Sequence, residues 1–128
     1  MYELLIQTHF AAAHRLREYA GNCERLHGHN WRIDVALRAP QVDRLGMVID
    51  FRDAKRLIED TLSGFDHQYL NELDAFREVN PTTENIARTI FDALAAKLPP
   101  EIAIAKVTAW ESDLCGASYI GEPEEPNL

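Results

Sequence analysis

The chain has 128 residues, of which 46% are hydrophobic and 27% are charged, and its formal net charge is −8. This length fits a single domain, and the acidic excess argues against a basic nucleic-acid-binding face or a polybasic membrane anchor. No apolar run approaches the roughly 18 to 20 residues of a membrane-spanning helix, and the first fifteen residues lack the pattern of a signal peptide. Two cysteines do not make a disulfide framework. The sequence therefore predicts a cytoplasmic protein that binds neither membrane nor nucleic acid.

The first half of the chain shows two alternating segments and one helical segment. Residues 2–13 and 31–38 place apolar side chains at every second position, which predicts two strands separated by a polar loop over 15–25. Asp50 is expected to cap a helix that ends at Gly64. The apolar stripe of this helix is formed by residues three and four apart: Phe51, Ala54, Leu57, Ile58, Thr61 and Leu62.

The second half shows one helical segment followed by two alternating segments. Residues 65–80 have no clear period and are predicted to form a packed loop. A second helix is expected to enter at Pro81-Thr82-Thr83-Glu84 and to end at Pro99-Pro100. Its apolar stripe consists of Ile86, Ile90, Phe91, Leu94 and Leu98. Residues 102–110 and 117–120 are predicted to be the third and fourth strands.

The order β-β-α-α-β-β predicts an α+β protein with a four-stranded antiparallel sheet and both helices on one face. Residues 1–122 are expected to form one domain, with 123–128 as a flexible tail. Such a sheet has two open edges, which invite pairing with a neighbouring protomer, so self-association is expected.

Three of the five histidines lie close together in the sequence. His27 and His29 are two residues apart, so an extended backbone directs both rings to one side, and an antiparallel pairing of the first two strands brings His14 beside them. Three imidazoles without a fourth protein ligand are typical of a catalytic zinc site with an open position. Gly28 would let the backbone approach the ion. The alternative is three unrelated histidines.

The two cysteines lead to different predictions. Cys23 lies four residues before His27 and could be a fourth, structural zinc ligand, a thiolate base or nucleophile near a dication, or a small buried apolar residue. The spacing alone does not separate these three interpretations. Cys115 is predicted to be a packing residue.

Five further polar positions are candidates. Asp66-His67 could form a proton relay if a turn brings the side chains together, or could be a capping Asp beside a helix-end His. Glu111, at the end of the third predicted strand, could accept two parallel N–H bonds from the N2/N3 edge of a pterin or guanine, or could be solvated. Thr82 and Thr83 are either helix caps or ligand contacts.

Six motifs follow one another along the sequence: Phe10-Ala11-Ala12-Ala13-His14, Cys23-x3-His27-Gly28-His29-Asn30, Ile49-Asp50-Phe51, Asp66-His67-x2-Leu70-Asn71, Asn80-Pro81-Thr82-Thr83-Glu84 and Glu111. Taken together and in this order, they resemble the 6-pyruvoyl-tetrahydropterin synthase family over about residues 2–122. The three-residue gap between Cys23 and His27 is similar to that of the bacterial 6-carboxy-5,6,7,8-tetrahydropterin synthase branch, which works in queuosine biosynthesis. A related branch of folate synthesis carries Glu at the position of Cys23.

The resemblance implies a tunnelling fold, in which trimers close a strand barrel and two trimers stack into a homohexamer with sites at the subunit interfaces. The family's residue roles are carried to this sequence as follows: zinc ligands His14, His27 and His29; catalytic Cys23; a relay of Asp66 and His67 from a neighbouring subunit; the pterin-anchoring Glu111; and pterin contacts from Thr82 and Thr83.

The implied activity is a zinc-dependent lyase that converts 7,8-dihydroneopterin triphosphate to 6-carboxy-5,6,7,8-tetrahydropterin, releasing acetaldehyde and triphosphate without a redox cofactor. Pyruvoyl-type chemistry that keeps the side chain, and a non-catalytic zinc-stabilised domain, are the alternatives. Because the substrate is polyanionic and the protein is acidic, local steering is expected from zinc and from Arg15, Arg17, Arg25 or Lys106.

Overall fold

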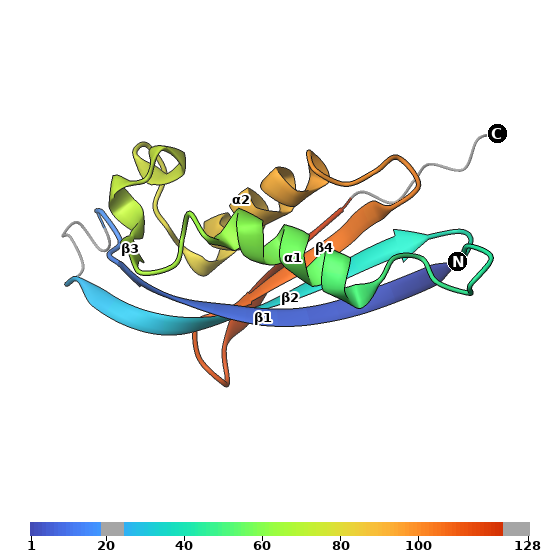
Figure 1. The fold of residues 1–128 in the computed structure, drawn as a ribbon. Coiled ribbons are helices and arrows are strands. Elements are labelled where there is room, and N and C mark those ends of the chain that lie inside the picture. Colours follow the sequence, from blue (N-terminus) through green and yellow to red (C-terminus); the bar gives the residue numbers. More distant parts are fainter. Residues whose placement is uncertain (19–24, 122–128) are drawn as a thin grey trace.

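The computed structural model describes residues 1–18 and 25–121, and its elements lie in one sheet with two helices packed on it (Figure 1). The strands form a sheet in the order β3-β1-β2-β4-β5, and all neighbours are antiparallel except β1 and β3. In chain order the elements are β1 (Tyr2–His14), β2 (His27–Ala39), α1 (Phe51–Leu62), β3 (Gln68–Tyr69), the 3-10 turns η1 (Leu70–Glu72) and η2 (Asp74–Phe76), α2 (Thr83–Ala95), β4 (Ala103–Trp110) and β5 (Gly116–Ile120). No helix among these residues is long and apolar enough to cross a membrane.

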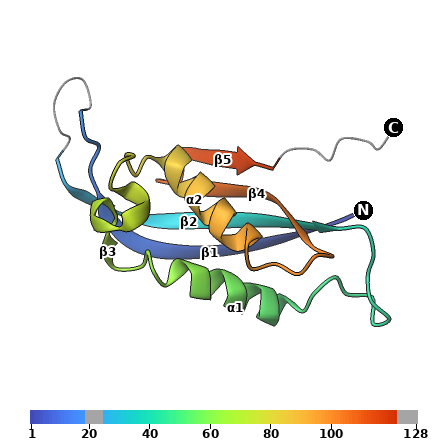
Figure 2. The ribbon, with the colours of Figure 1, turned by 90° about the horizontal axis from the view of Figure 1, so that it is seen from above.

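A long hairpin of β1 and β2 forms the centre of the sheet (Figure 2). The two strands have 13 residues each and pair without interruption from Tyr2 opposite Ala39 to His14 opposite His27. The predicted period-two face of the first strand is confirmed from Ile6 onward, where alternate side chains are buried. The second strand begins at His27, four positions before the predicted start, because the pairing with β1 continues to the end of the hairpin.

Both helices cover the same face of the sheet, as predicted (Figure 1). The core between the layers contains the buried side chains Phe10, Trp31, Ile33, Val35, Leu37, Ala54, Ile58, Leu62, Ile86, Ile90, Leu94 and Val107. On the opposite face, the side chain of Leu5 is 73% exposed. Among residues 1–18 and 25–121, no element covers this face (Figure 1). This uncovered face is available to another protomer.

The helix starts follow the predicted caps. The Asp50 carboxylate accepts from the Arg52 backbone N–H (2.8 Å), and the Thr82 hydroxyl accepts from that of Asn85 (3.1 Å). Phe51 was predicted to lie in the apolar stripe, but it is 61% exposed, because a side chain in the first turn has neighbours on only one side along the helix. Helix α2 ends at Ala95, before the predicted proline stop.

The segment 65–80 is packed, as expected, but it also adds a strand to the sheet. Ala12 and Ala13 pair in parallel with Gln68 and Tyr69, so the sheet has five strands and is mixed rather than four-stranded and antiparallel. A two-residue bridge has no detectable period, which is why the sequence pattern does not reveal it. The predicted tail, 123–128, lies outside the described residues.

Candidate metal centre and its surroundings

The loop end of the β1–β2 hairpin, where β1 ends and β2 begins, brings three histidines together. His14 is paired with His27, and His29 lies two residues further along β2, so all three side chains project from the face that carries the core. Trp31 continues this row, with its ring centroid 5.1 Å from that of His14 and 5.4 Å from that of His29. His14 is only 2% exposed, whereas the rings of His27 and His29 are partly open to solvent.

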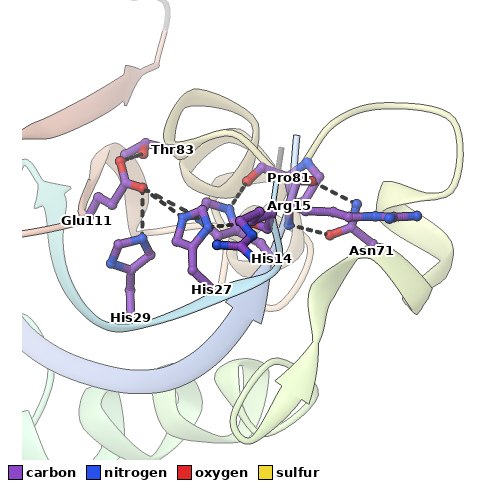
Figure 3. Close-up of polar contacts among 9 residues, drawn as sticks. His14, Arg15, His27, His29, Asn71, Pro81, Thr83 and Glu111 are labelled. Carbon is purple, nitrogen blue, oxygen red and sulfur yellow. Dashed lines mark hydrogen bonds and ion pairs between the residues drawn. The ribbon is translucent and has the colours of Figure 1, made fainter. Parts of the chain in front are cut away.

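The fourth member of the cluster is Glu111, which directly follows β4 (Figure 3). Its Oε1 lies 3.0 Å from His29 Nε2, 3.5 Å from His14 Nε2 and 3.9 Å from His27 Nε2. The Nε2 atoms of His14 and His27 are 3.0 Å apart. One potential ligand atom from each of the four residues thus lies within 4.8 Å of every other. The predicted proximity of the three histidines is confirmed.

The hydrogen bonds behind the rings assign the tautomers. His14 Nδ1 lies 2.8 Å from the Pro81 carbonyl oxygen, and His27 Nδ1 lies 2.8 Å from that of Arg25. A carbonyl oxygen only accepts, so both Nδ1 atoms carry hydrogen, and in the neutral rings both Nε2 atoms present lone pairs. Two lone pairs that face each other at 3.0 Å repel unless a cation lies between them. The donor set therefore fits a metal ion such as zinc, whose histidine ligands are commonly oriented by carbonyls in this way.

Thr83 and Cys115 hold Glu111 beside the histidines. The Thr83 hydroxyl donates to Glu111 Oε2 (3.4 Å), and the Glu111 backbone N–H donates to the Cys115 carbonyl (3.0 Å). The two predicted threonines differ in their contacts, because the Thr82 hydroxyl caps α2 while Thr83 faces the cluster. Cys115 itself is exposed, so the prediction that it is a packing residue is wrong: it lies in the β4–β5 turn, outside both layers.

Asp66 and His67 form the contact that the sequence left open. His67 has a left-handed backbone (φ 58°), and this turn places its Nδ1 3.0 Å from Asp66 Oδ2. The segment is fixed to β1, because the Ala11 N–H donates to Asp66 Oδ1 (3.0 Å) and the His67 N–H donates to the Ala11 carbonyl (2.6 Å). The Ala11 N–H is the main reason why the pKa of Asp66 is lowered from its ordinary value of 3.8.

The Asp66–His67 pair is not part of the group formed by the three histidines and Glu111. His67 lines a depression of about 530 Å³ together with Ala11, Ala13 and Asn30, and His29 lines the same depression. Asp66 and His67 therefore lie near the hairpin end that carries the histidines, but outside the group of potential metal ligands. The imidazole of His67 is 81% exposed.

Two other predicted residues remain to be placed. Gly28 was expected to allow a close backbone approach to the ion, but a Cβ there would meet only the Ala12 carbonyl at 3.9 Å. That expectation is wrong, because residue 28 alternates with His27 and His29 and faces away from the cluster. Cys23 lies outside the described residues.

Sequence reasoning missed the role of two asparagines that hold the segment after β1. Asn71 and Asn80 each bond both the N–H and the C=O of one residue, Arg15 and Arg17 respectively, at 2.8–2.9 Å. The Arg17 guanidinium donates to the carbonyls of Asn71, Phe76 and Val79. Arg17 is thus engaged in structure, and this contradicts its candidacy for anion steering. The only sequence signal for these contacts was that both asparagines belong to the motifs.

The fold and the site define an α+β protein in which three histidines at the end of a long hairpin form a group, with Glu111, that could hold a metal ion. Residues 3–122 match the family model for 6-pyruvoyl tetrahydropterin synthase, and the protein belongs to this family, with its tunnelling fold.

Three proteins illustrate the similarity. A 6-carboxy-5,6,7,8-tetrahydropterin synthase of Synechocystis is 35% identical over the whole of both sequences. A putative 6-carboxy-5,6,7,8-tetrahydropterin synthase of Archaeoglobus fulgidus is 40% identical over 92 residues, which is 72% of this protein and 75% of that one. The structure of Caenorhabditis elegans 6-pyruvoyl tetrahydropterin synthase superimposes with a TM-score of 0.82 at 27% identity, covering 94% of this protein and 96% of that one.

Proposed function

We propose that the protein is a zinc-dependent lyase that converts 7,8-dihydroneopterin triphosphate and water to 6-carboxy-5,6,7,8-tetrahydropterin, acetaldehyde and triphosphate, as a step towards queuosine in the cytoplasm. The observation that carries the proposal is the convergence of three imidazole Nε2 atoms, two of them with Nδ1 bonded to a carbonyl. Relatives that carry this enzyme name, one of them similar over its full length, support the choice of reaction.

His14, His27 and His29 would hold the metal. Zinc at this position would act as a Lewis acid on the hydroxyl groups of the substrate. The burial of His14 and the carbonyl bonds behind His14 and His27 fix the ring orientations before the ion binds. Little reorganisation is then needed on binding, and this favours affinity and a defined geometry.

Glu111 would recognise the pterin ring. A carboxylate can accept from the 2-amino group and from N3–H together, and such charge-assisted bonds are worth about 1.5 to 3 kcal/mol each. Thr83 donates to Glu111, and Thr82 caps the same helix one residue earlier, so both would lie near the bound ring. Glu111→Ala should weaken substrate binding at least tenfold.

Cys23 would act as the base that removes a proton from carbon in the propyl substituent of the substrate, and His67, oriented by Asp66, would carry protons to and from the oxygens of that substituent. The ring gains its hydrogen from its own substituent, so no redox cofactor takes part. Because Asp66 and His67 are not part of the histidine–Glu111 group of their own protomer, we assign the relay to a neighbouring subunit of a homohexamer built as a dimer of trimers.

Steering of the triphosphate falls to the remaining candidate cations, Arg15, Arg25 and Lys106. Lys106 and Thr108 lie on β4, and Asp34 lies on β2. All three line a depression on the uncovered face of the sheet. Because the net charge of the protein is −8, attraction of the substrate must be local and sensitive to salt.

Product analysis tests the proposal. Incubation with dihydroneopterin triphosphate should give the mass of 6-carboxytetrahydropterin together with acetaldehyde, and a chelator or Cys23→Ala should abolish both. The mass of the pyruvoyl product would instead establish the chemistry named for the Caenorhabditis elegans relative. A protein that makes neither product and unfolds on chelation would be a zinc-stabilised binding domain.

A further inference from the structure

The position of Glu111 corresponds to that of a fourth metal ligand. Four ligands placed about 2.0 to 2.1 Å from a tetrahedral zinc ion are about 3.3 Å from one another. The separations between Glu111 Oε1 and the three Nε2 atoms are 3.0, 3.5 and 3.9 Å, and His14 and His27 are 3.0 Å apart. Glu111 thus occupies the corner that a three-histidine site would leave open (Figure 3).

Three contacts fix the position of Glu111 at this corner, one through its carboxylate, one through its backbone and one through the preceding residue. Its other oxygen accepts from Thr83, and its backbone N–H is bonded within the turn to Cys115. The preceding residue, Trp110, is anchored through its indole N–H to Asp34 (2.9 Å). The Glu111 side chain is nevertheless 36% exposed, so an incoming ligand can reach it.

Glu111 cannot perform both roles at the same time. Pairing with the N2/N3 edge of a pterin engages both carboxylate oxygens, whereas the observed position directs Oε1 at the three imidazoles. One role has to end before the other begins. The pterin edge offers two charge-assisted hydrogen bonds in exchange for one oxygen ligand.

We propose that Glu111 closes the metal site of the substrate-free subunit as its fourth ligand, and that the pterin ring draws the carboxylate away and thereby opens the metal to the hydroxyl groups of the substrate. The second half of this inference rests on the proposed function. The arrangement makes ring recognition a condition for metal access, so that water and small anions are kept from the metal until a pterin binds.

The experiment uses Co²⁺ as a spectroscopic substitute for zinc and azide as a probe of an open position. In the full-length parent, azide should perturb the cobalt absorption bands only at high concentration. In Glu111→Ala the azide affinity should rise at least tenfold, and the zinc affinity measured by chelator competition should fall at least tenfold. Glu101→Gln, which removes an exposed carboxylate before the start of β4, at the opposite end of that strand from Glu111, is the matched control and should change neither value.

Pterin itself, the ring without a substituent at C6, tests the exchange. It offers the N2/N3 edge but no hydroxyl groups for the metal, so saturating pterin should raise the azide affinity of the parent at least tenfold and leave that of Glu111→Ala unchanged. Azide and zinc affinities of Glu111→Ala within twofold of the parent would refute the fourth-ligand role, and an unchanged or lower azide affinity with pterin would refute the exchange. Either result leaves the lyase proposal standing, whereas a parent that binds neither zinc nor cobalt would remove its basis.

Discussion

At Gly116, the first residue of β5, a single added methyl group would clash with Trp110, the residue before Glu111. A Cβ at this position would lie 2.7 Å from two atoms of the Trp110 ring and 3.0 Å from the Ala109 carbonyl oxygen. The ring cannot easily move, because its N–H is bonded to Asp34 and the Arg32 guanidinium lies 4.6 Å above its centroid. Glu111 follows Trp110 directly, so strain here reaches the group of Glu111 and the three histidines.

We therefore expect Gly116→Ala to lower the free energy of unfolding by about 1 to 3 kcal/mol, the usual cost of forcing extra volume into a packed site. Urea denaturation followed by tryptophan fluorescence measures this. Gly64→Ala is the matched control, because a Cβ at Gly64 meets no atom within 4 Å, and its effect should stay within about 0.5 kcal/mol. Equal stability of the two variants would show that the β4–β5 turn adjusts freely.

Asp66 makes the stability of the fold depend on pH. Its pKa is lowered from 3.8 mainly by the Ala11 N–H, with a further contribution from His67. A lowered pKa in the folded state means that the carboxylate stabilises the fold above the unfolded pKa, and that this stabilisation is lost as the pH falls through the folded pKa.

Asp66→Asn should accordingly reduce the loss of melting temperature between pH 5 and pH 3, a window chosen to bracket the ordinary pKa of 3.8. Thermal unfolding monitored by circular dichroism at several pH values gives the comparison. The exposed Asp113 provides the control substitution, Asp113→Asn, whose profile should follow that of the parent. If Asp66→Asn were as acid-sensitive as the parent, the Ala11 bond would not be a source of stability.

At the scale of elements, what the sequence could predict was set by period and length. The hairpin and the two helices carry long periodic patterns, and the prediction that His14 lies beside His27 followed from pairing the first two strands. Strand β3 could not be predicted, because two residues are too few to show a period and their partner is more than 50 positions away. The proximity of Glu111 to the three histidines also depends on the long-range pairing of β4 with β2. No local pattern in the sequence encodes this pairing.

The paired asparagines act between elements. Asn71 and Asn80 bond the backbone of Arg15 and Arg17 as a neighbouring strand would, and so tie the end of β1 to the segment before α2. Pro81, whose carbonyl orients His14, is the next residue after Asn80. The asparagine contacts therefore hold both His14 and its hydrogen-bond partner Pro81 in place.

Asn80→Ala leaves a part-buried N–H and C=O of Arg17 without their amide partner and should cost about 1 to 3 kcal/mol of unfolding free energy. Asn80→Asp retains the acceptor for the Arg17 N–H but loses the donor, so an intermediate loss is expected. Chemical denaturation and exchange of the Arg17 amide hydrogen provide the two readouts. Unchanged exchange protection in Asn80→Ala would contradict the proposed tie.

At the scale of the whole molecule, one protomer leaves sheet surfaces uncovered. The uncovered sheet face, the exposed Leu5 and the open edges at β3 and β5 favour pairing with another protomer, and the Asp66–His67 pair is not part of the histidine–Glu111 group of its own protomer. We expect six protomers per particle in light scattering at micromolar concentration. A monomer under these conditions would refute the assembly and, with it, a relay supplied by a neighbouring subunit.

We propose that the three histidines bind the metal on which the activity depends. Metal analysis of purified protein tests this most directly. The parent and His9→Ala, a control that removes an exposed histidine from the same hairpin, should each contain one zinc per protomer. The double variant His27→Ala/His29→Ala should contain almost none, because it loses two of the three nitrogen ligands. Full zinc occupancy in the double variant would contradict the claim.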